Sequence, residues 1–102
     1  MNKYVCARPV HPGEILKEEI EYRGISQGKL AAQMGISYKM LNNILNERRQ
    51  ITTQTAMLFE AALGIPANML IGLQTDYNMQ VESSDTSFAE RLAQIRKAVA
   101  VF

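Results

Sequence analysis

The sequence has little of what supports covalent or metal chemistry. It contains one cysteine, Cys6, one histidine, His11, and no tryptophan. One cysteine excludes an intramolecular disulfide, and one histidine excludes a histidine-rich metal site. No paired carboxylates, activated nucleophile or glycine-rich phosphate loop stands in a recognisable motif, so we expect neither an enzyme nor a bound cofactor or metal.

Long apolar runs are also lacking. None approaches the roughly 20 residues that span a bilayer, and the N-terminus has no apolar core of the kind found in signal peptides. These absences predict a cytoplasmic protein without membrane contact. The length of 102 residues suits one small helical domain with an appendage, at a size where oligomerisation often adds stability.

The net charge is only +1, but the charges are unevenly distributed along the chain. Residues 22 to 50 carry five basic side chains against the single acid Glu47, whereas residues 51 to 90 carry five acids and no base. The last twelve residues carry three bases and no acid. Positive charge concentrated at residues 22 to 50 can attract phosphate although the whole chain is near neutral; the alternative is scattered, separately solvated charges.

Residues 27 to 46 predict two short helices joined by a tight turn at Gly35. Gly35 suits the left-handed conformation that ends a helix, and Ser37 is placed to cap the next one. Ala31 is small enough for two helices to cross closely, and apolar residues recur at helical spacing on both helices. These apolar residues are Leu30, Ala31, Met34, Met40, Leu41, Ile44 and Leu45. The pattern is that of a helix-turn-helix.

The same packing leaves polar side chains on the outer face of the second helix: Tyr38, Lys39, Asn42, Asn43 and Asn46. Amides can pair bidentately with adenine and lysine can donate to guanine, so this face suits the major groove of double-stranded DNA. The alternative is an ordinary helical hairpin whose outer face is only solvated.

Further helices are predicted on both sides of this motif. The HPGE sequence at residues 11 to 14 opens one that ends at Gly24, and Ser26 then caps the first helix of the motif. After the motif and a polar loop, Thr52 or Thr53 caps a fourth helix. The stripe expected to close the core over the motif consists of Ala56, Phe59, Ala62 and Leu63.

A fifth helix is predicted from residue 66 to about residue 76. Its apolar residues cover more than one face: Met69, Leu70, Ile71, Leu73 and Tyr77. A short helix at a domain edge that is apolar on two sides usually buries the second side elsewhere, so we interpret this helix as a homodimer interface. The alternative is that the chain's own tail wraps it.

The C-terminal part is predicted to be a linker followed by an amphipathic helix. Residues 78 to 86 are polar, and residues 87 to 102 restart a helix in which Ser87 and Glu90 have capping-box spacing. Its stripe is Phe88, Leu92, Ile95, Val99 and Phe102. Because so short a helix is unstable alone, it must pack on its own domain, on a second copy or on another protein. The predicted organisation is an arm at 1–10, a helix-turn-helix domain at 11–77 and the linker with its helix at 78–102.

Five segments carry a family resemblance. They are HPGEILKEE (11–19), GISQGKLA (24–31), NERRQIT (46–52), ALGIP (62–66) and LQTDYNM (73–79). In order and spacing they resemble HigA-type antitoxins, which belong to the phage-repressor-like helix-turn-helix proteins. The match covers about residues 11 to 80, so the roles of the arm and the tail helix are not inherited from it.

The resemblance implies an all-α fold with a five-helix domain, to which the C-terminal helix is an addition. Such a domain dimerises, binds an operator in its own promoter and neutralises a toxin, in this family a HigB-like mRNA endonuclease that depends on the ribosome. By position in the motif, the residues that resemble base readers are Tyr38, Lys39 and Asn43, with Asn42 beside them. Those that resemble phosphate-binding residues are Ser26, Gln27, Asn46, Arg48 and Arg49. Tyr38 departs from a glutamine-rich reading helix, and it suits a thymine methyl or a phosphate equally well.

Two other functions stay open at this stage. One is a stand-alone transcriptional repressor of the same fold without a toxin, and the other is a helical module that binds only proteins. A neighbouring reading frame for a small basic protein would favour the antitoxin, whereas absence of DNA binding would favour the protein-binding module.

Overall fold

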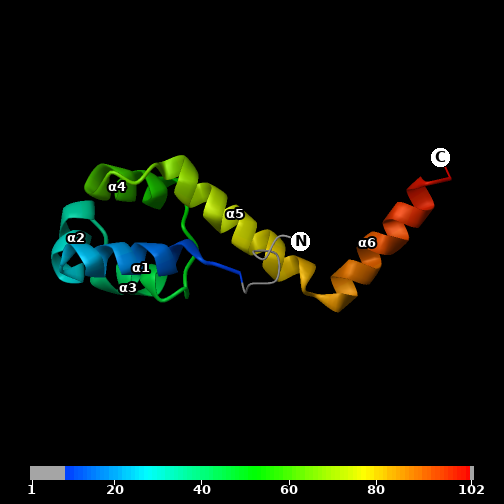
Figure 1. Cartoon of the computed structure of the whole chain (residues 1–102), viewed down its shortest axis with the longest axis horizontal. Helices are drawn as coiled ribbons and strands as arrows, with labels where there is room; N and C mark the ends of the chain where they lie inside the picture. The colour runs from blue at the N-terminus through cyan, green and yellow to red at the C-terminus, as the bar shows by residue number, and fades with distance from the viewer. Residues whose placement is uncertain (1–8, 102) are drawn as a thin grey trace.

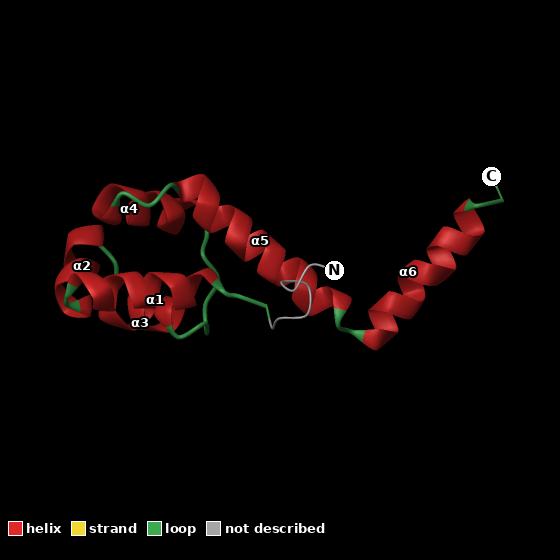
Figure 2. Cartoon of the chain, viewed as in Figure 1, coloured by secondary structure: helices red, strands yellow, loops and turns green. Residues whose placement is uncertain are grey.

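The computed structural model describes residues 9–101, and this part of the chain folds into six helices (Figure 1). They are α1 (Pro12–Arg23), α2 (Gln27–Met34), α3 (Tyr38–Leu45), α4 (Thr53–Leu63), α5 (Ala67–Ser83) and α6 (Thr86–Val99). Figure 2 shows that the described residues contain helices and loops but no strand. The predicted all-α fold with an additional C-terminal helix is confirmed. The predicted arm lies outside the described residues apart from its last two.

The molecule is elongated, with extents of 57 × 28 × 22 Å. Helices α1 to α4 and the first part of α5 form a bundle, and α5 continues out of this bundle to a bend that leads into α6 (Figure 1). Helix α6 contacts α5 near the bend and has no buried residue. Its stripe remains accessible, since Phe88, Ile95 and Val99 are 37%, 50% and 52% exposed.

The helix ends of the bundle follow the predicted caps. Gly35 ends α2 with a φ of 73°, a left-handed conformation that costs glycine little because it has no Cβ. The hydroxyls of Ser26 and Ser37 accept the backbone N–H groups of Lys29 and Met40 at the starts of α2 and α3. At α4 the cap is Thr52, the first of the two predicted alternatives. Each of the three hydroxyls accepts a backbone N–H that the helix itself leaves unpaired.

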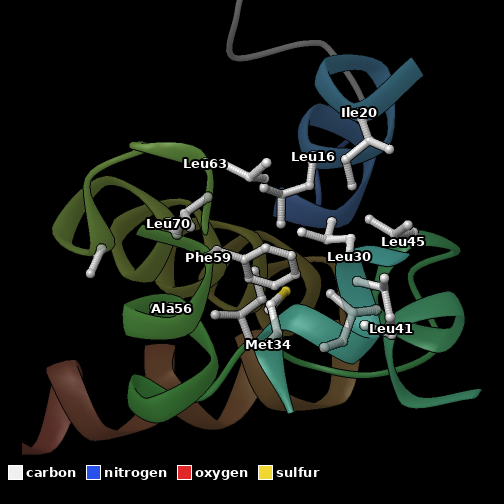
Figure 3. Close-up of a cluster of buried hydrophobic side chains, with 14 residues drawn as sticks. Leu16, Ile20, Leu30, Met34, Leu41, Leu45, Ala56, Phe59, Leu63 and Leu70 are labelled. Carbon is white, nitrogen blue, oxygen red and sulfur yellow. The ribbon is translucent and has the colours of Figure 1, made fainter. Parts of the chain in front are cut away.

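The core lies where α1, α2, α3, α4 and α5 meet, with the ring of Phe59 near its centre (Figure 3). Phe59 is fully buried, as are Leu16 of α1, Leu41 of α3 and Leu70 of α5. The predicted stripe of α4 was wrong at one position: Ala62 is exposed and Thr55 is buried instead. Thr55 can be buried because its hydroxyl is paired with the backbone of Thr52.

The predicted linker at residues 78 to 86 was wrong over most of its length. Helix α5 continues to Ser83, and the chain leaves helical structure only at Ser84 and Asp85. A polar sequence forms a solvated helix as readily as a linker when nothing in it breaks the backbone hydrogen bonds. The cap of α6 also differs from the prediction, because the Asp85 side chain, not that of Ser87, accepts the Phe88 N–H at 3.1 Å.

Candidate nucleic-acid interface

Helix α3 is held from behind by α1 and α2. Its inward residues Leu41, Ile44 and Leu45 are at most 1% exposed. The start of α1 approaches α3 so closely that a Cβ on Gly13 would overlap the carbonyl oxygen of Ile44. Only glycine permits this approach. The outer face of α3 is therefore presented on a rigid support.

The predicted base-reading residues do lie on this outer face, with unequal exposure. Tyr38 is 57% exposed and Lys39 is exposed, both in the first turn of α3. Asn42 and Asn43, one turn further on, are only partly exposed. The N-terminal turn thus offers the free side chains, and the second turn offers amides that neighbouring residues partly cover.

A hydrogen-bond network ties these amides to the ends of the motif. The Asn42 Nδ2 donates to Gln27 Oε1 at 3.2 Å, across the turn from α2. Arg48, in the loop after α3, donates from Nη2 to Asn42 Oδ1 and from Nε to Asn43 Oδ1, both at 3.1 Å. Gln27 and Arg48, two residues expected to contact phosphate, therefore bind Asn42 and Asn43, which are predicted to read bases.

The other residues expected to contact phosphate have mixed environments. The Ser26 hydroxyl caps α2, which engages its oxygen but leaves the residue exposed. Asn46 donates to the Asn42 carbonyl and accepts from Lys17 Nζ at 3.2 Å. Lys17 of α1 was not predicted as part of this surface. The sequence shows it only as a polar residue on a helix, which does not indicate that it meets Asn46. Arg49 is exposed beside Arg48.

Comparison with known proteins identifies the family. A helix-turn-helix family pattern matches residues 16–70. The chain is 32% identical in sequence, with a TM-score of 0.74, to an addiction module antidote protein of the HigA family from Coxiella burnetii; the match covers 79% of this chain and 89% of that one. The chain belongs to the HigA-type antitoxin family.

Two further relatives support this assignment. Antitoxin HigA of Pseudomonas aeruginosa, solved with the higBA promoter, is 31% identical with a TM-score of 0.70, over 86% of this chain and 91% of that one. Virulence-associated protein I of Dichelobacter nodosus is 35% identical over 77 residues, which are 74% of this chain and 71% of that protein.

Two of the segments that carry the family resemblance, HPGEILKEE (11–19) and LQTDYNM (73–79), meet in the structure. His11 of the HPGE segment is 2% exposed and packs edge-on against the ring of Tyr77, with 4.9 Å between ring centroids. Gln74, three residues before Tyr77, is also buried and accepts the Ile51 N–H at 2.8 Å. His11 therefore packs on the same part of α5 that holds the loop at Ile51 through Gln74.

Protonation of His11 is expected to destabilise the fold. Its Nδ1 accepts the Gly13 N–H at 2.9 Å, which only the neutral ring can do. Burial lowers the pKa of His11 below its ordinary value of 6.5, against the opposing effect of the Glu47 carboxylate. The pKa of His11 is lower in the folded than in the unfolded protein, so neutral His11 stabilises the fold. This contribution is fully present above about pH 6.5 and is lost as pH falls through the folded-state pKa.

Urea unfolding between about pH 8 and pH 5 measures this contribution. The variant His11→Asn retains a side-chain oxygen for the cap and does not titrate. Its stability should therefore decline less over the same interval, and an equal decline in parent and variant would contradict the assignment to His11.

The homodimer interface predicted on α5 needs one correction. Leu70 is fully buried in the core and cannot contact a second copy. Leu70 lies on the inner face of α5 with Ala67, three residues before it, and Gln74, four residues after it. Met69 is 46% exposed, and Ile71, Leu73 and Tyr77 are partly exposed. The apolar surface that α5 offers to a second copy therefore excludes Leu70.

Two further features concern the described part of the chain only. Within residues 9–101, no cluster of three or more His, Cys, Asp or Glu side chains could hold a metal ion. No helix in that range is long and apolar enough to cross a bilayer.

Proposed function

We propose that this chain is a DNA-binding antitoxin that represses its own operon and neutralises a HigB-like mRNA endonuclease. The single observation that carries the DNA-binding part is the outward face of α3, where Tyr38, Lys39, Asn42 and Asn43 stand on a buried support. A helix mounted in this way can enter the major groove with its first turn toward the base edges. The antitoxin part draws its support from the family and from the relative solved with a promoter.

Within this proposal, the outer face of α3 reads bases, and the residues around it bind the DNA backbone. Ser26 and Gln27 at the start of α2, Asn46 at the end of α3 and Arg49 in the following loop flank the reading helix on both sides. Polar side chains and helix N-termini in such positions contact phosphates and set the register of the helix on the duplex. The surplus of basic residues between 22 and 50 adds a sequence-independent attraction.

Lys39→Ala and Asn43→Ala are each expected to weaken operator binding by about 1 to 3 kcal/mol. Both side chains lie on the outer face, so thermal unfolding should change little. Competition binding against operator and unrelated duplex checks the prediction, since loss of a base contact weakens only the specific complex. Gln80→Ala, on the exposed outer part of α5, is the control. Parent-like operator affinity in both variants would remove these residues from the reading surface.

The homodimer proposed for this protein uses the accessible part of α5. Met69→Glu places a charge on that apolar surface, so the dimer dissociation constant should rise by at least about tenfold while the monomer stays folded. Sedimentation at several concentrations measures this. Tyr22→Glu, at an 88% exposed position on α1, is the control and should leave the dimer unchanged. An unaltered dimer in the Met69 variant would place the interface elsewhere.

A two-fold dimer also makes a prediction about the operator. Its half-sites should be inverted and separated by about one helical turn or a multiple of it. Footprinting on the promoter tests this, and protection of a single asymmetric site would contradict the dimeric mode of binding.

The toxin partner is tested by purifying the tagged protein from its host and identifying what accompanies it. Recovery of a small basic protein together with the protein's own promoter fragment is the result expected for an antitoxin. Recovery of the promoter alone would instead favour a repressor of the same fold without a toxin.

A further inference from the structure

Helix α3 ends in a turn that folds the chain back beside its outer face. Glu47 has a φ of 64°, the one left-handed non-glycine residue among those described. The Arg48 N–H donates to the Asn43 carbonyl at 2.8 Å, which is the long-range hydrogen bond of a Schellman-type helix end. This hydrogen bond fixes the backbone of Arg48 beside Asn43, and the side chain of Arg48 binds Asn43 as well.

Among residues 9–101, the guanidinium of Arg48 donates hydrogen bonds to the oxygen ends of two amides. Its Nε donates to Asn43 Oδ1, and its Nη2 donates to Asn42 Oδ1. A guanidinium has donors but no acceptor, so it cannot bind the nitrogen end of an amide. Of the two orientations that the Asn43 amide could adopt, this contact selects the one with oxygen toward Arg48. The amide nitrogen then supplies the donors that remain for a ligand.

This orientation bears on which base Asn43 can read. An asparagine that is free to turn pairs with adenine, because its oxygen accepts from N6 while its nitrogen donates to N7. Arg48 occupies one of the two lone pairs of the Asn43 oxygen and leaves both N–H donors of the amide, which favours donation to a base over acceptance from it. Guanine presents two adjacent acceptors, N7 and O6, in the major groove. The geometry therefore opposes the adenine preference that the residue type alone would indicate.

We propose that Arg48 is a positioning residue for base readout, which orients the Asn43 amide so that this position of α3 selects guanine over adenine. This role differs from the phosphate contact that the family resemblance implies for Arg48. The proposal rests on the proposed DNA-binding function of α3, and it concerns specificity at a single base position in each half-site.

The test compares the parent with Arg48→Lys on a set of operators that differ at one base position. That position is the one whose base preference Asn43→Ala abolishes. Lysine keeps the charge but lacks the fork that holds two amide oxygens at once. The parent should favour guanine over adenine by about tenfold, and Arg48→Lys should lose this preference or reverse it. The salt dependence of binding should be unchanged, because the number of charges is unchanged.

Two further variants make the result decisive. Arg49→Lys, at the adjacent arginine, should retain the guanine preference of the parent. Adding Arg48→Lys to Asn43→Ala should change the base preference at this position no further, because Arg48 acts on this position through Asn43. Thermal unfolding of each variant confirms that the fold is retained, so that a change in base preference cannot result from unfolding.

The opposite results are equally clear. If Arg48→Lys keeps the guanine preference, while Arg48→Ala weakens binding equally on all sequences and lowers the salt slope by about one, Arg48 is a phosphate contact and the proposal is wrong. If the folded parent binds neither operator nor unrelated DNA, the DNA-binding function itself fails, and the proposal fails with it.

Discussion

Replacing Gly13 by alanine is expected to destabilise the fold by about 3 kcal/mol or more, because the new Cβ would overlap backbone atoms. The atom it would meet is the carbonyl oxygen of Ile44, in the last turn of α3. A side chain can move away from such a clash, but this oxygen is held by the helix. Relief requires α1 to shift away from α3, which would open the core between Leu16 and Ile44.

A matched variant separates this effect from helix propensity. Gly72 lies within α5 and has open space where a Cβ would point. Gly72→Ala should therefore stabilise the protein by about 0.5 to 1 kcal/mol, the usual gain from replacing glycine in a helix. Urea unfolding of the two variants gives both numbers. If Gly13→Ala were as stable as the parent, the close approach of α1 and α3 would be wrong.

The consequence of Gly13→Ala for DNA binding follows from the same geometry. The start of α1 supports the end of α3, where Asn43 and the turn to Arg48 lie. A displaced α1 would change the position of Asn43 and of the turn that follows it. Tyr38 and Lys39 would be affected less, because they lie at the other end of α3. Any protein that remains folded should accordingly lose operator specificity more than its non-specific affinity.

The boundaries of most helices could be predicted because each depends on residues close in sequence. Ser26, Ser37 and Gly35 act through hydrogen bonds or backbone angles within a few residues of their own positions. The end of α5 could not be predicted in the same way. Residues 78 to 83 have no apolar stripe, and a solvated helix and a polar linker share that composition.

The outward face of α3 was also predictable, since it is what remains when the apolar residues face the core. Contacts between distant segments were not. Lys17 and Asn46 are separated by 29 positions in the chain, and Gln74 and Ile51 by 23. No local pattern indicates that such pairs meet. Arg48 is a different case, because its partners Asn43 and Asn42 lie only five and six positions away. These contacts depend on the left-handed turn at Glu47, which no glycine marks in the sequence.

Gln74→Leu is expected to cost about 3 kcal/mol, although leucine has nearly the same volume as glutamine. The Gln74 side chain is 4% exposed, and its Oε1 accepts the Ile51 N–H at 2.8 Å. Leucine would leave that buried N–H without a partner, and the penalty for an unpaired buried donor exceeds the net value of the hydrogen bond itself. The loss of stability should be largest at Ile51 and the residues that lead into α4.

The measurement is urea unfolding combined with hydrogen exchange of the Ile51 amide. Asn78→Ala is the control: it removes the partner of Gln74 Nε2 at 3.1 Å but leaves the bond to Ile51 in place. It should cost less than about 1 kcal/mol, because Asn78 is only partly buried and water can replace it. An Ile51 amide that stays protected in Gln74→Leu would show that another acceptor can replace the glutamine.

The same variant links stability to the interface. The loop between α3 and α4 carries Arg48 and Arg49, and its far end is held to α5 through Gln74 and Ile51. If this hydrogen bond keeps the loop in place, Gln74→Leu should weaken operator binding although residue 74 is buried and distant from the outer face of α3. Restored binding in Gln74→Glu, which retains an acceptor oxygen, would show that the hydrogen bond and not the side-chain volume is responsible.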